Sequence, residues 1–443
     1  MPFLLNATIR YHLSKYKDEH PEFVRKIIEG FYVDDLVSGG NNVEETYQLY
    51  ERSKVRLAES GFKLRKWKTN HKDLREKIAK DDTKSLNETR IKNEQESYAK
   101  STLGTEVSER CEKVLGMSWD CERDTIRFSF QHIISAAEKV KRTKRNVLSL
   151  LTRIFDPLGI ISPVLVCMKL LFQETCVAEI GWDDELQGEM RQKWDAWIME
   201  LRETKLIEVD RCLYIDPSDD IYEYQLHGFG DASTKAYCAV VYLVCRTAKR
   251  TYARMICSKS RVAPLKTLTI PRLELMSAKL LAQLMHTVRK ALGQEIQISQ
   301  VKYWLDSKTA LCWIQNRGEW KQFVHHRVNE ILKLTSKIEW QHCPGEQNPA
   351  DIGSRGMGPT ELKENNHWWQ GPQWLSEGED AWPLVTSNTQ TPESKEEEKK
   401  IATAMVVEAH ETNSIAGIID LSCYSRQLRL IRVSVCATFC AQL

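Results

Sequence analysis

Apolar residues follow a strand pattern and then a helical pattern between residues 222 and 342. Three stretches rich in Val, Tyr, Leu and Ile predict strands at 224–229, 236–245 and 250–259. Apolar positions then recur with helical spacing from Pro271 to Leu292, where the proline opens the helix. The pattern continues with a strand at 300–305, helices at 307–316 and 324–334, and a last strand at 337–342. Strands followed by helix, strand and helix predict an α/β unit spanning about 220–360.

The amino-terminal half alternates between amphipathic segments and one long polar stretch. Its pattern predicts helices at 6–17, 21–28 and 43–60, and two short strands joined by a tight acidic turn within 30–40. Residues 69–109 have few large apolar side chains, so we expect a solvated insertion or a disordered loop there. Segments 114–119 and 125–130 predict a hairpin. A mainly helical region at 145–206 is interrupted by proline and glycine at 156–159 and 162–163.

The composition limits the class of protein without identifying it. The chain has 443 residues, of which 42% are hydrophobic and 28% charged, as in globular proteins of two or three domains. The net charge of +2 favours no polyanionic partner, so nucleic-acid binding would depend on local basic clusters. One cluster lies at 139–145, and the other comprises Lys63, Arg65, Lys66 and Lys68. Either cluster can equally be a solvated helix face.

Cysteine usage and hydropathy favour an intracellular protein. The 13 cysteines are scattered without CxxC pairs, which favours reduced thiols over a disulfide framework. The amino terminus has no basic region ahead of an apolar run, and no stretch is long and apolar enough to span a bilayer. We therefore expect a cytoplasmic or nuclear protein with no membrane partner.

Four carboxylates stand at matching places in the α/β unit. Asp231 follows its first strand, and Glu274 lies in the first turns of the long helix. Asp306 ends a later strand, and Asp351 comes after the last one. Acids at strand ends can converge on one edge of a sheet, and their hard oxygens suit Mg²⁺ or Mn²⁺. Taken singly, each acid is better explained by a structural role, as a helix cap or a solvated side chain, than by a catalytic one. Together they predict a site for two cations about 3.5–4 Å apart, suited to phosphodiester cleavage.

The same unit resembles the type 1 ribonuclease H domain of retroelements, and specifically its BEL/Pao retrotransposon branch. The segments 270–275, 304–307 and 348–356 carry the resemblance. It implies a βββαβα fold that cuts the RNA strand of an RNA–DNA hybrid with two Mg²⁺ or Mn²⁺ ions. It also implies that the catalytic metal ligands are Asp231, Glu274, Asp306 and Asp351. Many cellular relatives have a histidine before the last aspartate; the counterpart here is His342, which we expect to be a polar residue at a strand end.

A second resemblance lies in the amino-terminal segment. The sequence from Phe31 to Asp35 is similar to the YxDD turn of reverse transcriptases, and segments 3–9 and 61–67 look like the surrounding BEL/Pao palm. Residues 1–70 would then be a partial polymerase palm, with Asp34 and Asp35 as its acids and the nearby basic cluster as a nucleic-acid contact. Residues 71–144 would comprise a polar insertion and a primer-gripping hairpin. The first palm acid should lie upstream of Met1, so we expect no independent polymerase activity.

The region 145–215 resembles the segment of Pao-type elements to which a peptidase name is attached. An aspartic peptidase needs two carboxylates that share a proton, usually in Asp-Thr-Gly or Asp-Ser-Gly turns, and the chain contains no such tripeptide. We therefore favour a connection region and interpret Asp156 as part of an interhelical loop. Residues 361–443 look like the approach to an integrase, with a polar linker at 386–400 and no zinc-ligand pair.

The combined interpretation is a multidomain α/β fragment of a retrotransposon polyprotein. It would comprise a partial palm, a mainly helical connection region and a ribonuclease H-like domain, acting on nucleic acid with other parts of the polyprotein. One alternative is a catalytically inert remnant that still binds nucleic acid. A second alternative is a Pao-type aspartic peptidase.

Overall fold

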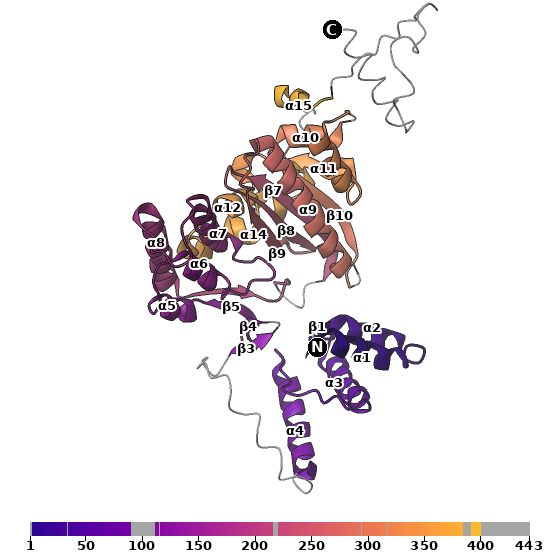
Figure 1. The fold of residues 1–443 in the computed structure, drawn as a ribbon. Coiled ribbons are helices and arrows are strands. Elements are labelled where there is room, and N and C mark those ends of the chain that lie inside the picture. The colour runs from indigo at the N-terminus through magenta and orange to yellow at the C-terminus, as the bar shows by residue number, and fades with distance from the viewer. Residues whose placement is uncertain are drawn as a thin grey trace, which may run out of the picture. The chain divides into compact units, whose positions relative to one another are not determined.

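A five-stranded mixed sheet is the largest element of the fold (Figure 1). In this computed structural model the described residues are 2–32, 34–89, 111–114, 116–215, 220–293, 295–316, 318–383 and 391–399. The sheet has the order β11-β10-β7-β8-β9, and its strands are β7 (Ile221–Ala232), β8 (Ala236–Thr247), β9 (Thr251–Val262), β10 (Ile298–Leu305) and β11 (Trp340–His342). Strands β7, β8 and β9 are antiparallel, whereas β10 is parallel to both β7 and β11.

Three helices connect the parallel strands and confirm the predicted α/β class. They are α9 (Ile270–Leu292), α10 (Lys308–Gln315) and α11 (Gln322–Leu332). The parallel neighbours β10 and β11 need a long crossover, which α10 and α11 supply, and α9 carries the chain from β9 at one edge past β8 and β7 to β10. The observed order matches the predicted strands and helices, except that a short 3₁₀ helix at Lys337–Glu339 replaces the start of the last strand.

Strand β8 is buried on both faces, which explains its continuous apolar sequence. Its alternate residues Tyr237, Val241 and Leu243 belong to the core beneath α9. The residues between them, such as Val240 and Tyr242, belong to a second core on the opposite face. Because side chains alternate along a strand, one uninterrupted apolar run supplies both cores.

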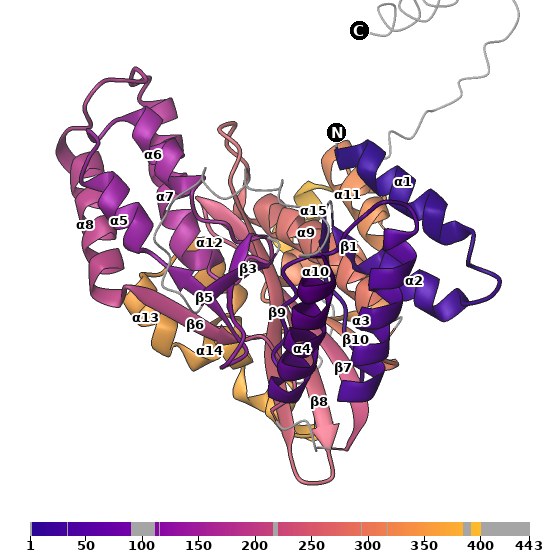
Figure 2. The same cartoon turned by 90° about the horizontal axis from the view of Figure 1, so that it is seen from below.

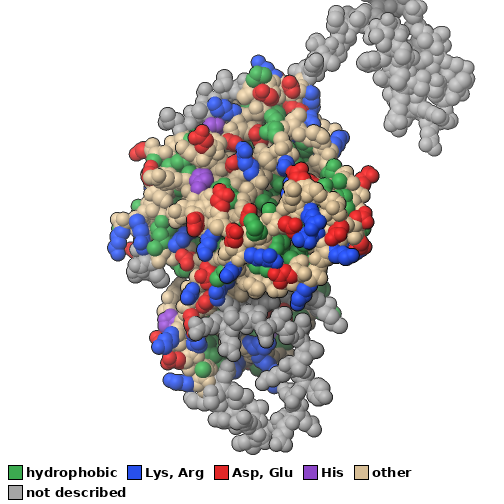
Figure 3. Space-filling model, turned by 90° about the vertical axis from the view of Figure 1, so that its left-hand side faces the viewer, with side chains coloured by type: hydrophobic (Ala, Val, Ile, Leu, Met, Phe, Trp, Pro, Cys, Tyr) green, Lys and Arg blue, Asp and Glu red, His purple; other side chains and the backbone are tan. Residues whose placement is uncertain are grey.

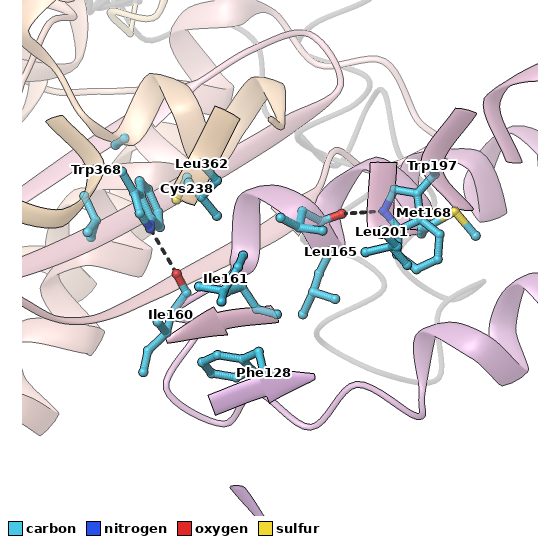
Figure 4. Packing of buried hydrophobic residues seen from close by; sticks show 14 of the residues in the cluster. Phe128, Ile160, Ile161, Leu165, Met168, Trp197, Leu201, Cys238, Leu362 and Trp368 are labelled. Atoms are coloured by element: carbon cyan, nitrogen blue, oxygen red, sulfur yellow. Dashed lines mark hydrogen bonds between the residues drawn. The ribbon is translucent and has the colours of Figure 1, made fainter. Parts of the chain in front are cut away.

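The second core joins the sheet to the helices that precede it in sequence. These are α5 (Gln131–Ala137), α6 (Lys144–Leu151), α7 (Ser162–Val177) and α8 (Gly188–Thr204), with α12 (Ala350–Arg355), α13 (Pro359–Glu364) and α14 (Asn366–Gln370) from the other end. Figure 4 shows how the indole of Trp368 donates to the Ile160 carbonyl at 3.0 Å, and that of Trp197 to the Val164 carbonyl at 3.3 Å. The core therefore combines residues that precede position 215 with residues that follow position 220, and the proposed five-part division of the chain remains a prediction.

The loop before α7 is fixed by its acid and its glycine. Both carboxylate oxygens of Asp156 accept backbone N–H groups, from Ile160 at 2.8 Å and Ile161 at 2.9 Å. Gly159 has φ +70°, and a Cβ there would overlap the backbone carbonyl of Ser258 in β9. The loop therefore holds α7 against the sheet, and Asp156 fixes the backbone of the two residues that precede that helix.

The amino-terminal segment contains the predicted elements and one helix that was not expected. Its elements are α1 (Pro2–Ser14), α2 (Pro21–Gly30), β1 (Phe31–Tyr32), β2 (Asp35–Leu36), α3 (Val43–Ala58) and α4 (Lys72–Thr89). The solvated loop predicted for 69–109 is wrong where α4 lies. Leu74 and Ile78 are one helical turn apart and pack against Tyr50, so two apolar residues anchor a strongly charged helix. Residues 90–110 lie outside the described part of the chain.

A four-stranded antiparallel sheet includes the predicted hairpin. Its strands are β3 (Cys111–Val114), β4 (Met117–Asp120), β5 (Thr125–Ser129) and β6 (Leu206–Asp210). Strand β6 was not predicted, because the five residues after α8 pair with β5 across a long sequence separation. Residue 115 of the expected primer-gripping hairpin lies outside the described residues.

The polar linker predicted at 386–400 is wrong for residues 391–399. Helix α15 (Pro392–Glu396) packs against α10, and both views place it beside that helix (Figure 1, Figure 2). Ser394 is completely buried, and the Trp313 indole donates to its carbonyl at 3.3 Å. We call residues 391–398 the clip. The positions 384–390 and 400–443, including the expected approach to an integrase at 424–436, lie outside the described residues.

The surface carries charges of both signs. Figure 3 shows one face on which Lys, Arg, Asp and Glu side chains are interspersed, in keeping with the net charge of +2. None of the helices in the described ranges is long and apolar enough to cross a membrane.

Candidate active site

Asp231 and Asp306 occupy neighbouring positions on two parallel strands. Leu305 of β10 is in register with Gly230 of β7, so the next residue of each strand is one of the two acids. Asp231 was expected just after the first strand, but β7 continues to Ala232 and Asp231 pairs with Cys238 of β8. The sheet itself therefore fixes the backbone of Asp231, with only 4% of the residue exposed.

Two helices bring the other predicted acids to the same sheet edge. Glu274 lies in the first turns of α9, which packs against β7 and β8. Asp351 lies in the first turn of α12, which also contacts these two strands. Electrostatic coupling links Asp231 to both Asp306 and Asp351, and Glu274 to Asp231. The structure thus gathers all four acids that the sequence singled out.

Burial and mutual repulsion raise the pKa values of three of these acids. Burial and the neighbouring Asp306 raise the pKa of Asp231 well above its ordinary value. Burial and the charge of Glu274 likewise raise the pKa of Asp306, while burial raises that of Glu274. Neighbouring carboxylates in a poorly solvated site cannot all ionise without a compensating positive charge.

The sequence around Asp351 explains how α12 reaches the site. The buried side chain of Asn348 donates to the carbonyl of Gly230 at 2.9 Å and accepts from the Ala350 N–H at 3.1 Å. A Cβ on Gly353 would overlap the sulfur of Cys238, so only glycine lets α12 lie this close to β8. The close approach allows the hydroxyl of Ser354 to donate to the carboxylate of Asp231.

Two residues that sequence reasoning missed contact the predicted acids. Ser354 binds Asp231, and the Arg355 guanidinium donates to Asp351 at 2.5 Å. They stand three and four residues after Asp351, which puts them on neighbouring positions of one helical face. That spacing is the signal that could have identified them. Arg355 also forms an ion pair with Asp351, so it offsets part of the repulsion among the four acids.

The donor set suits a hard divalent ion, although it does not form a closed cage. Across the described ranges, no group of three or more acidic, histidine or cysteine side chains has the arrangement of a metal site. The four side chains nevertheless offer only carboxylate oxygens, the ligands that Mg²⁺ and Mn²⁺ favour. The raised pKa values of Asp231, Glu274 and Asp306 indicate an excess of negative charge that a cation would relieve. The residues therefore fit such ions, and their role as metal ligands remains a prediction.

The predicted polymerase residues lie in the separate amino-terminal segment. Tyr32 pairs with Asp35 in the β1–β2 hairpin, so Asp34 stands in the turn, and both acids are exposed. In the segment after α3, apolar residues such as Leu64 and Trp67 pack against the apolar clusters of the amino-terminal helices. The predicted basic residues are all exposed; they are Lys63, Arg65, Lys66 and Lys68. Their role in binding nucleic acid remains a prediction.

Two of the five basic residues in the second cluster, at 139–145, form ion pairs. Arg142 donates to Asp195 at 2.6 Å. Arg145 binds Asp183 through two bonds of 2.8 and 2.9 Å. These contacts favour a structural role for the two arginines. His342 is the last residue of β11, and burial lowers the pKa of its imidazole.

A protein-family model described as the Pao retrotransposon-like RNaseH-like domain matches residues 143–307. The matched range begins at Thr143, which caps α6, and ends at Ser307. It includes three of the four acids, Asp231, Glu274 and Asp306. No curated protein matches the chain in sequence.

Among solved structures, parts of the chain are similar to ribonucleases H and to a viral polymerase. LC11-RNase H1, isolated from compost by a metagenomic approach, is 16% identical, with a TM-score of 0.22 over 30% of this chain and 91% of that one. The same protein in complex with an RNA/DNA hybrid is 15% identical, with a TM-score of 0.21 over 29% and 91%. The foamy viral protease-reverse transcriptase in complex with double-stranded DNA is 12% identical, with a TM-score of 0.32 over 53% and 38%.

Proposed function

We propose that the α/β unit hydrolyses the RNA strand of RNA–DNA hybrids with two divalent ions, Mg²⁺ or Mn²⁺. The ligands would be Asp231, Glu274, Asp306 and Asp351. The observation that carries the proposal is that these acids meet at the carboxyl ends of the parallel strands β7 and β10, where the pKa values of Asp231 and Asp306 are raised. The amino-terminal segment would be a partial polymerase palm that needs other parts of a retrotransposon polyprotein to act.

The protein's own residues would position the reacting groups. When bound, two such ions activate a water molecule and stabilise the leaving oxygen of a phosphodiester. Asp231 and Asp306 project from a rigid sheet, which fixes their separation. Ser354 orients Asp231 by its hydrogen bond, and Arg355 holds Asp351 at the rim of the site. The raised pKa values of Asp231 and Asp306 oppose the ionised form that binds cations, so activity should fall in acid.

The test is incubation of the full chain with an RNA–DNA hybrid labelled on the RNA strand, with Mg²⁺ or Mn²⁺. Because the core joins the α/β unit to α6–α8, the full chain is preferable to a fragment. We expect internal cuts in the RNA strand by the wild-type chain and none by Asp231→Asn. Asp34→Asn is the matched control: it removes an exposed acid of the other segment and should cut normally. Equal cutting by wild type and Asp231→Asn would overturn the site assignment.

The two alternatives predict different outcomes of the same experiment. An inert remnant would bind the hybrid and leave it intact with either metal. An aspartic peptidase would cleave polypeptide in a manner blocked by pepstatin and abolished by Asp156→Ala. The bonds from Asp156 to two backbone amides favour a structural role for this acid over a catalytic one.

A further inference from the structure

The clip places an acidic residue on a basic group beside the candidate site. The guanidinium of Arg272 donates to one carboxylate oxygen of Glu397 at 2.7 Å through Nε and lies 2.6 Å from it through Nη2. The backbone of Lys321 donates to the Glu397 carbonyl at 2.7 Å, and its ammonium to the Glu396 carbonyl at 2.5 Å. The clip is thus held mainly by cationic side chains of the α/β unit.

Two arginines lie together beside the contact between Glu397 and Arg272. Arg272 and Arg327 both lie on the ring of Phe323, with guanidinium carbons 4.8 and 3.5 Å from its centre. Arg327 donates to the Phe323 carbonyl and to the sulfur of Met276, and the charge of Glu330 also acts on it. Glu397 therefore binds only one of the two guanidiniums on this ring. A pair of guanidiniums of this kind attracts a polyanion.

The bond between Glu397 and Arg272 is an imperfect ion pair. Only one carboxylate oxygen of Glu397 is bonded, and the other is buried with no hydrogen-bond partner. A buried oxygen without a partner costs free energy, so this carboxylate is a poor occupant of its position. A phosphate group presents more oxygens to the same donors and matches a guanidinium as well as a carboxylate does.

The clip lies near the start of α10, where one of the predicted catalytic acids is also bound. The hydroxyl of Thr391 in the clip lies 2.8 Å from that of Thr309 in α10. Ser307, which caps the same helix and follows Asp306, forms a hydrogen bond with Glu274. Arg272 stands two residues before Glu274 on α9, so the two side chains leave the helix in different directions. A strand of nucleic acid whose phosphodiester lay at the acids would therefore have its neighbouring phosphates near the clip.

We propose that Arg272, Lys321 and Arg327 bind backbone phosphates of the nucleic-acid substrate and that the clip covers this site, with Glu397 in the place of a phosphate. The inference rests on the proposed function, because it assumes that nucleic acid is the ligand of the adjacent acids. The clip then competes with the nucleic acid for the same cations. The apparent affinity for nucleic acid is the intrinsic affinity multiplied by the fraction of molecules in which the clip is open.

Binding of a fluorescently labelled RNA–DNA hybrid to the full chain tests this inference. Measurement by anisotropy in EDTA separates binding from cleavage. We expect Glu397→Gln to bind the hybrid roughly tenfold more tightly than wild type, because the clip then covers the basic residues less often. We also expect its affinity to fall more steeply with salt, by about one unit of logarithmic slope for each added phosphate contact. Glu393→Gln, an exposed residue of the same helix, makes the same charge change and should bind as wild type does.

A second variant separates a phosphate site from a purely structural clip. Adding Arg272→Gln to Glu397→Gln should abolish the gain in affinity, since the uncovered cation is then missing. If Glu397→Gln binds the hybrid as wild type does and only its melting temperature falls, the inference is overturned. The clip would then have a purely structural role. Absence of hybrid binding by every variant would also count against it. If Glu397→Gln binds more tightly but no variant cuts RNA with Mg²⁺ or Mn²⁺, the proposed function fails and the phosphate site stands.

Discussion

Gly353 of α12 lies directly on Cys238 of β8, and this contact sets the distance between α12 and Asp231. Alanine is the better helix former by about 1 kcal/mol, but overpacking a core costs about 1–3 kcal/mol, so the clash decides. We expect Gly353→Ala to lower the free energy of unfolding by about 1–2 kcal/mol and to reduce RNA cleavage. Chemical denaturation and the hybrid assay measure the two effects.

The size of the neighbouring side chain provides the control. Cys238→Ala removes the sulfur that a Cβ at position 353 would meet. The double variant Gly353→Ala with Cys238→Ala should therefore recover about half of the stability lost by Gly353→Ala alone. Strictly additive losses would show that the contact does not position α12.

Replacement of Asp231 by asparagine should stabilise the protein in the absence of divalent ions. The pKa of Asp231 is raised in the fold, so its contribution to stability is fully present below the ordinary carboxyl pKa and is lost as pH rises through the higher folded value. Between about pH 5 and about pH 8, the melting temperature of wild type in EDTA should fall more than that of Asp231→Asn.

The difference between the two proteins isolates Asp231 from another titrating group. Burial lowers the pKa of His227 to about 3, so its contribution is present above the ordinary histidine pKa and is lost as pH falls. The titration of His227 therefore changes stability with pH in the opposite direction to that of Asp231, and it is common to wild type and Asp231→Asn. Parallel melting curves over the whole pH range would contradict the raised pKa of Asp231.

Divalent ions should stabilise wild type much more than the variant. A ligand whose free concentration is about 100 times its dissociation constant adds about 2.7 kcal/mol to the free energy of unfolding. We expect Mg²⁺ or Mn²⁺ to raise the melting temperature of wild type, with a larger effect at neutral pH than in acid. Asp231→Asn should show a small shift, and Asp34→Asn should respond as wild type does. Equal shifts in all three proteins would indicate that the ions bind elsewhere.

Removal of the carboxylate of Asp156 should affect stability and not peptide cleavage. It leaves two amides, those of Ile160 and Ile161, without their acceptor, at a cost of about 2–3 kcal/mol. Asp184 accepts the Gly181 N–H at 3.0 Å in an exposed loop, so Asp184→Ala should cost less than about 1 kcal/mol. Urea unfolding gives both values. A pepstatin-sensitive cleavage that disappears only in Asp156→Ala would support the peptidase alternative instead.

The sequence predicts the α/β class and the order of its elements because each follows from local periodicity. Strand β8 comes from the continuous apolar run at 236–245, and Pro271 marks the start of a long amphipathic helix. The positions of Asp231 and Asp306 followed from one rule, that parallel strands end at a common edge. Their convergence was therefore predictable, although the raised pKa values that follow from their burial were not.

The features that sequence reasoning missed depend on distant partners. Ile207 and Val209 alternate as in a strand, but five residues are too few to be recognised without their partner β5. The sequence of the clip is that of a polar linker, because its buried residue is Ser394 and the residue that pairs with Arg272 is Glu397. Ser354 and Arg355 look like ordinary surface residues until α12 is seated on β8. In each case tertiary contacts decide where local propensity is weak.

The hydrogen bond from Trp368 to Ile160 spans 208 residues of sequence, and this span constrains synthesis of the chain. A ribosome adding about 5–20 residues per second needs about 10–40 s to pass from one partner to the other. During that time the apolar surface of α7 cannot be covered by the segment that finally covers it. The nascent chain should therefore depend on chaperones, and termination before residue 368 should yield an insoluble product rather than a smaller nuclease.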